Sequence, residues 1–248
     1  MKVFLDVGAH EGQILSSILD PKYAFDMIYV FEPVKQLHIK LRKLADGRQN
    51  ITLLKYGLWD KNVTHNIYSP GTVAGSIFTA HQDIDVNVFE LCQFVNASEW
   101  FNKNINLDDE VYVKLNCEGA EADILNDLME SKEIVKIKDV MIDFDVRKVK
   151  GLENMQKEIL NKFEEANFKS YSLCEDVMIG PSAITRIQNW LDNAGAKKTD
   201  IKSQINQLLY WIKMIVLGQR PGYGWELKHF IKYYTPLLLL KILGAKRS

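Results

Sequence analysis

The segment 3–12, VFLDVGAHEG, places an aspartate and a glycine-bounded turn at the end of an apolar run. This pattern is typical of a buried strand that leads into a ligand-binding loop, because ligands of open α/β sheets bind beyond the carboxyl ends of the strands. The dinucleotide fingerprint G-x-G-x-x-G needs its second glycine for a pyrophosphate, and His10 stands there instead. Glu11 adds negative charge where phosphates would lie. The loop therefore argues against NAD, FAD and a P-loop, and His10 is expected beside cofactor or substrate.

A cofactor with positive charge and no phosphates suits this loop better. S-adenosylmethionine carries a sulfonium and an α-ammonium, which Asp6 and Glu11 could face, and Gly8 and Gly12 would let the backbone approach its amino-acid end closely. Asp6 is better explained as a loop organiser that accepts backbone N–H groups, with ligand contact as the alternative. Glu32 ends the second apolar run, where an acidic residue can accept hydrogen bonds from both ribose hydroxyls. NAD enzymes share this ribose contact, so Glu32 alone does not separate the two cofactors.

Four segments, taken in order, resemble the FkbM family of S-adenosylmethionine-dependent methyltransferases over roughly residues 2–175. They read FLDVGAHEGQ, VFEPVKQLHIKL, LLKYGLWDKN and VYVKLNCEGAEADIL. A glycine-rich first loop is a weak motif by itself, whereas the ordered set, with Glu32 and Pro33 in FEP, is specific. The resemblance implies a class I methyltransferase fold, S-adenosylmethionine as cofactor, and O-methylation, commonly of sugar hydroxyls.

The chain departs from the family pattern at two strand ends. The usual fourth-strand motif is K-x-D-x-E-G-x-E, and Asn116 stands where its aspartate is expected, with Glu118 retained. At the end of the fifth strand a Glu-x-His pair is common, and this chain has Asp143 and Asp145. These differences bear on the catalytic site, in which Asn116 could also contact the cofactor, more than on the fold.

Methyl transfer to a hydroxyl depends on alignment of the two reactants, and a nearby carboxylate can take the proton. Glu118 is the first candidate for this base or for a hydroxyl acceptor, since it would point the same way as Asn116 if the strand continues. Asp143 and Asp145 come next, and Lys114 could line the site. Glu118 could instead favour the dipole at a helix start, and the two aspartates could be solvated or bind a cation.

The irregular stretch 57–95 holds further candidates. Trp59 follows the third strand, where an adenine ring would rest, or it caps the core. Ser76, with Gly75, stands where family members often approach the cofactor, or the pair forms a plain turn. His65 and His81 are expected at the surface, although they could reach substrate. Because no His, Asp or Glu cluster has metal-ligand spacing, no essential metal is predicted.

Apolar strand-like runs alternate with amphipathic helical stretches through the first two-thirds of the chain. This rhythm predicts an α/β fold with a doubly wound, mostly parallel sheet. Strands are expected near residues 2–8, 26–33, 50–58, 111–116, 137–146 and 169–180, and helices near 12–20, 34–46, 118–131 and 151–168. Short antiparallel strands or a loop near the ligand are expected between residues 57 and 95.

The chain has 248 residues, 47% of them hydrophobic and 25% charged, as in an ordinary globular protein. Its three cysteines are scattered, which favours reduced thiols over disulfides or a zinc site. No signal peptide or membrane-length apolar run is seen. A cytoplasmic protein is therefore expected.

Charge divides the chain into an acidic body and a basic tail. Residues 181–248 hold 11 Lys and Arg against 3 Asp and Glu, whereas residues 1–180 hold 20 against 29. We predict a methyltransferase domain over 1–180 and a basic, helical C-terminal extension over 181–248. The extension is expected to pack or dock on a partner rather than to lie on a membrane. Nucleic-acid binding is not expected, because no known module is present and the body is acidic.

The sequence thus predicts an S-adenosylmethionine-dependent O-methyltransferase acting on a sugar or glycan. Its first strand begins at residue 2, so we expect a domain of a longer chain, and the resemblance implies fusion to, or docking on, glycosyltransferase domains. An O-methyltransferase of a non-sugar metabolite and a non-catalytic cofactor-binding scaffold remain alternatives, the second because of Asn116. An NAD-linked enzyme is disfavoured by His10 and Glu11.

Overall fold

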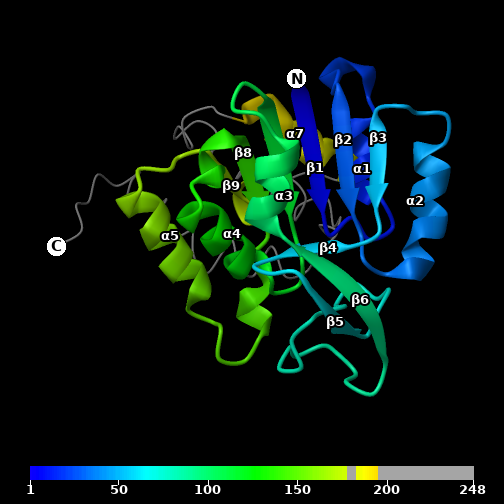
Figure 1. The fold of residues 1–248 in the computed structure, drawn as a ribbon, viewed down its shortest axis with the longest axis vertical. Coiled ribbons are helices and arrows are strands. Elements are labelled where there is room, and N and C mark those ends of the chain that lie inside the picture. Colours follow the sequence, from blue (N-terminus) through cyan, green and yellow to red (C-terminus); the bar gives the residue numbers. More distant parts are fainter. Residues whose placement is uncertain (178–182, 195–248) are drawn as a thin grey trace, which may run out of the picture.

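A computed structural model describes residues 1–177 and 183–194, and its centre is a six-stranded parallel sheet (Figure 1). The strand order is β3-β2-β1-β7-β8-β9, with every neighbouring pair parallel. The chain moves outward in one direction from β1 and then in the other from β7, so the topological switch point lies between these strands. The predicted doubly wound α/β fold is confirmed. The strands are β1 (Lys2–Val7), β2 (Met27–Phe31), β3 (Ile51–Leu54), β7 (Glu110–Leu115), β8 (Ile137–Ile142) and β9 (Tyr171–Leu173).

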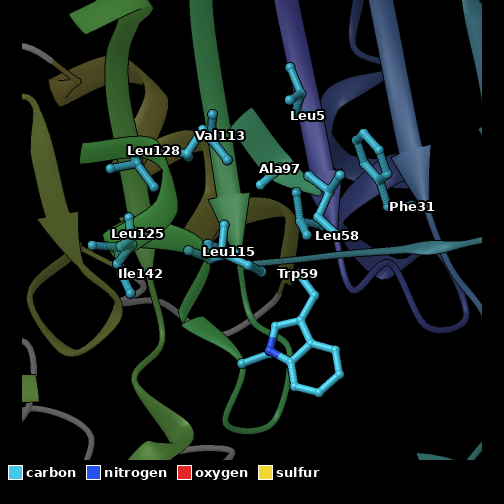
Figure 2. Packing of buried hydrophobic residues seen from close by; sticks show 14 of the residues in the cluster. Leu5, Phe31, Leu58, Trp59, Ala97, Val113, Leu115, Leu125, Leu128 and Ile142 are labelled. Atoms are coloured by element: carbon cyan, nitrogen blue, oxygen red, sulfur yellow. The ribbon is translucent and has the colours of Figure 1, made fainter. Parts of the chain in front are cut away.

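The central strands are apolar on both faces because helices cover both sides of the sheet. In β1, Leu5 packs into one buried cluster and Phe4 into the other. Figure 2 shows the first cluster, in which Leu5 and Phe31 meet side chains of the other central strands and of the covering helices. Helices α3 (Ala97–Asn104), α4 (Glu121–Glu130) and α5 (Met155–Glu165) contribute to this cluster.

The second cluster lies on the opposite face of the sheet. Helices α1 (Gln13–Ile18), α2 (His38–Ala45) and α7 (Ala183–Asn193) contribute to it, and a short helix α6 (Cys174–Val177) follows β9. The sequence did not predict α3, whose start is capped by the Asn96 side chain accepting from the Glu99 N–H. Short 3₁₀ turns span residues 21–23, 35–37, 133–136 and 145–148.

A smaller three-stranded sheet lies beyond the carboxyl ends of the large one (Figure 1). It contains β4 (Gly57–Trp59), β5 (Val63–Tyr68) and β6 (Phe89–Asn96) in the order β4-β6-β5. The antiparallel pairing of β5 with β6 agrees with the predicted short strands, whereas β4 runs parallel to β6. The long connection from β5 to β6 is thereby held near the ends of the central strands.

Every strand of the large sheet ends earlier than predicted. β3 stops at Leu54, and residues 57–59, expected in the same strand, form β4 of the small sheet. β8 stops at Ile142 rather than at residue 146, because the chain turns into the 3₁₀ segment Asp145–Lys148. β7 stops at Leu115, so Asn116 and Glu118 lie on a turn and strand alternation does not set their directions.

Helix α7 belongs to the α/β body although it lies past the predicted boundary at residue 180. Ile187 and Trp190 are fully buried in the second cluster. Trp190 packs edge-on against Phe4, and its Nε1 donates a hydrogen bond to Oδ1 of Asp139 at 2.8 Å. The rest of the predicted extension lies outside the described residues, so its helices and its docking stay predictions. Among the residues that the structure describes, no helix is long and apolar enough to cross a membrane.

If α7 completes the core, Trp190→Ala should lower the free energy of unfolding by about 3–5 kcal/mol, because it leaves a cavity against Phe4. Leu107→Ala is the control, since Leu107 is 70% exposed and should cost less than about 0.5 kcal/mol. Chemical denaturation of the full chain measures both. Equal, small losses in the two variants would show that α7 does not stabilise the body.

Candidate functional site

A cavity of about 490 Å³ opens at the carboxyl ends of the central strands. Residues that follow β1, β2, β7, β8 and β9 line it. The β5–β6 connection also contributes, with Gly71, Thr72, Val73, Gly75 and Ile77. It lies at the topological switch point, where open α/β sheets bind their ligands, and it has the size of an ordinary small-molecule pocket.

The cavity brings together most of the residues singled out from the sequence. Eight of them line it, namely Gly8, His10, Glu32, Pro33, Asn116, Glu118, Asp143 and Asp145. Five others do not, namely Asp6, Glu11, Gly12, Trp59 and Ser76. Lys114 also lines it, as expected.

Glu32 presents an oriented, buried carboxylate to the cavity. Its Oε2 accepts the His10 N–H at 2.8 Å and its Oε1 accepts the Val34 N–H at 2.9 Å. Each carboxylate oxygen keeps a further lone pair for a ligand. Burial raises the pKa of Glu32 to about 7, although the two N–H groups oppose that rise.

The glycines of the loop that follows β1 are required by close packing. Gly8 has a φ of +76°, and a Cβ there would lie 1.9 Å from the carbonyl oxygen of Asn116, so this glycine lets β1 and β7 close against each other. Gly12 has a φ of +83° and packs against Leu41 and Leu44 of α2 rather than against the cavity. His10 also has a positive φ, of 51°, and its Nε2 lies 3.3 Å from the Gly71 carbonyl oxygen.

The two acidic residues of this loop were expected to face the cofactor, but neither lines the cavity. Glu11 turns outward to an ion pair with Lys40 of α2. Asp6 is fully buried between the strands, with its Oδ1 3.2 Å from Nζ of Lys114, its parallel partner in β7. Burial raises the pKa of Asp6. Neither carboxylate lines the cavity, and Asp6 has the structural position that the loop-organiser interpretation describes. The argument against a pyrophosphate therefore rests on His10.

Trp59 and Ser76 have structural contacts instead of cofactor contacts. Trp59 is 7% exposed and lies at the edge of the cluster in Figure 2, and its Nε1 donates to Oδ2 of Asp123 at 2.8 Å. It therefore caps the core. Ser76 is buried and donates from Oγ to the carbonyl oxygen of Glu118 at 2.6 Å, so it fixes the backbone at Glu118.

The two strand ends that depart from the family pattern meet in the cavity. Asn116 donates from Nδ2 to Oδ2 of Asp143 at 3.1 Å. Arg147 donates to Oδ1 of the same carboxylate at 3.4 Å. Asn116 thus orients Asp143, and both residues line the cavity at the topological switch point.

Glu118 lies at the centre of a charged cluster with Lys148, which the sequence did not indicate, and His81, which was expected at the surface. Its Oε2 lies 3.0 Å from Nζ of Lys148 and 3.4 Å from Nε2 of His81. His81 is 4% exposed, so its expected surface position is wrong. The spacing of Lys148 three residues after Asp145 could have revealed a pair, whereas the approach of His81 depends on tertiary structure alone. Despite burial, these partners lower the pKa of Glu118.

Glu121 has a structural position. It is fully buried, and its carboxylate accepts the N–H groups of Cys117 and Gly119, which closes the turn between β7 and α4. Burial raises its pKa to about 7.

Within the described residues, no group of three His, Cys, Asp or Glu side chains is placed to hold a metal ion.

No family model and no curated protein matches the chain. Among solved structures, the chain is similar to a crystal structure of methyltransferase FkbM from Methylobacillus flagellatus KT, with 16% sequence identity and a TM-score of 0.35. The match covers 52% of this chain and 29% of that chain, so this chain spans less than a third of that protein.

The raised pKa of Glu121 should make stability fall with rising pH. Between its usual value of 4.5 and about 7 the folded state holds a proton that the unfolded state has lost, so ionising this residue costs the fold about 3 kcal/mol. Glu121→Gln cannot titrate. The free energy of unfolding of wild type minus that of the variant should therefore decrease by this amount between pH 4.5 and 7.5 in urea denaturation. A pH-independent difference would show that Glu121 ionises normally in the fold.

Proposed function

We propose that the protein is an S-adenosylmethionine-dependent O-methyltransferase that acts on a hydroxyl of a sugar or glycan. The observation that carries this proposal is the Glu32 carboxylate, held by two backbone N–H groups at the edge of a switch-point cavity whose other end is acidic. Such a site suits a ligand with a ribose at one end and positive charge at the other.

The residues present fit this cofactor. Glu32 would accept the two ribose hydroxyls with its remaining lone pairs. From β2 across β1 and β7 to β8 the strand ends span roughly 14 Å, enough to hold the nucleoside and its amino-acid end side by side. The lining side chains include more acids than bases, namely Glu32, Glu118, Asp143, Asp145 and Glu175 against Lys114, Lys148 and Arg186.

His10 supports the same choice of cofactor. Its imidazole lines the cavity, where a dinucleotide site has a glycine so that the backbone can reach a pyrophosphate. The ring contact with the Gly71 carbonyl keeps it there.

The acceptor would lie beside Glu118 and Asp143, at the ends of β7 and β8. When bound, the cofactor supplies an activated methyl group, and the protein holds the hydroxyl in line and accepts its proton. Glu118 is ionised and lines the cavity, so it suits both tasks. A sugar as the acceptor is supported by the FkbM-like motifs. A screen of neutral glycosides against non-sugar alcohols, read as S-adenosylhomocysteine formation, separates the two acceptor classes.

Calorimetric titration of Glu32→Gln with S-adenosylmethionine and S-adenosylhomocysteine tests the cofactor. We expect wild type to bind both and the variant to bind at least about 100-fold more weakly, because each hydrogen bond to a charged acceptor contributes about 1.5–3 kcal/mol. Glu11→Gln is the matched control. Since Glu11 pairs with Lys40 outside the cavity, its affinity should stay at the wild-type value.

The same titration should depend on pH in wild type. Because the pKa of Glu32 is raised to about 7 and the ribose hydroxyls donate to the ionised form, affinity should fall about tenfold per pH unit below that value. Binding of NAD in place of S-adenosylmethionine would overturn the proposed function, as would equal weakening by Glu11→Gln.

A further inference from the structure

Glu118 and Asp145 form a buried carboxyl pair bridged by one cation. The Nζ of Lys148 lies 3.0 Å from Oε2 of Glu118 and 2.9 Å from Oδ1 of Asp145. Asp145 is 2% exposed. Both line the cavity.

Two carboxylates that share a site cannot both ionise without a large penalty. Asp143 and Glu121 add further negative charge near Asp145, and Lys148 is the cation that opposes them. Burial and these carboxylates raise the pKa of Asp145 to about 9, whereas the pKa of Glu118 is lowered.

The imidazole of His81 lies beside Glu118. The Asp83 N–H donates to Nδ1 of His81 at 3.3 Å, so a neutral ring carries its proton on Nε2, which lies 3.4 Å from Oε2 of Glu118. His81 is held in place by a β-bridge to Val149 and by the Gln82 N–H, which donates to the Lys148 carbonyl at 2.9 Å.

We propose that this pair of carboxyl groups holds a single proton, carried by Asp145, so that Glu118 is the base that takes the acceptor's hydroxyl proton while Asp145 donates a hydrogen bond to a neighbouring oxygen of the acceptor. His81 is a positioning residue that keeps Glu118 ionised. The catalytic part of this assignment rests on the proposed function. The pair therefore suits a neutral acceptor that offers two adjacent oxygens, one to give a proton and one to accept a hydrogen bond, as in a vicinal diol.

The transfer step balances with these groups. The bond from the methyl carbon to sulfur breaks and the bond from that carbon to the hydroxyl oxygen forms. The sulfonium becomes a neutral thioether, and the hydroxyl proton moves to Glu118. Asp145 keeps its own proton throughout, and Glu118 returns its proton to water after the products leave.

Carbon-13 NMR of the full chain, labelled at the Asp and Glu carboxyl carbons, tests the shared proton without any acceptor. We expect one aspartate signal to titrate near pH 9 and to disappear in Asp145→Asn. In Glu118→Gln the same signal should titrate at lower pH, because a neighbouring negative charge is gone. Asp46→Asn, an exposed control, should leave it unchanged. If Asp145 titrates in the usual range near pH 4, the proposal is wrong.

His81 is tested by the titration of Glu118. His81→Phe keeps an aromatic ring but removes the donor, and should raise the pKa of Glu118 by about one pH unit. His81→Gln, which can still donate, should restore part of the shift, whereas a purely structural role would leave the Glu118 titration unaltered in both variants. These outcomes do not depend on cofactor binding, so they are distinguishable from failure of the calorimetric test above.

Discussion

The ion pair between Asp6 and Lys114 joins the two central strands where the cavity begins. The residues are register partners on β1 and β7, both almost fully buried. The Nζ of Lys114 also donates to the carbonyl oxygens of Val7 and Gly8, which holds the first loop. Removing one partner of such a pair leaves a buried charge without its counterion, which costs about 3–5 kcal/mol. The position of His10, and through it the anchoring of Glu32, depends on this loop.

The site concentrates carboxyl groups that the fold would bury more easily as neutral groups. Glu32 and Asp145 both have raised pKa values, and desolvation is the first cause in each case. The backbone N–H groups around Glu32 offset part of that cost, and Lys148 does so for Asp145. A cationic ligand would relieve the rest. Carboxyl groups with raised pKa values in a switch-point cavity lower the stability of the unliganded protein and mark a candidate functional site.

The small sheet completes the acidic end of the cavity. Its β5–β6 connection delivers Ser76 to the backbone of Glu118 and His81 to its carboxylate. Glu118 has a φ of +51°, a strained conformation for a residue with a side chain. Contacts from two other parts of the chain, residues 76–81 and Lys148, hold it there. Such strain persists only where the surroundings fix it, which agrees with a functional position.

The sequence by itself determined the layered α/β fold and the place of Glu32, because apolar runs report burial on both faces of a sheet and strand ends mark the ligand edge. It also indicated that Asn116, Asp143 and Asp145 would gather there. Only the tertiary structure decided the direction of individual side chains. Glu11 turns to Lys40 because α2 passes beside it. His81 lies beside Glu118 because it forms a β-bridge with Val149, which is far away in the sequence. Such contacts join residues far apart in the chain, and no local pattern encodes them.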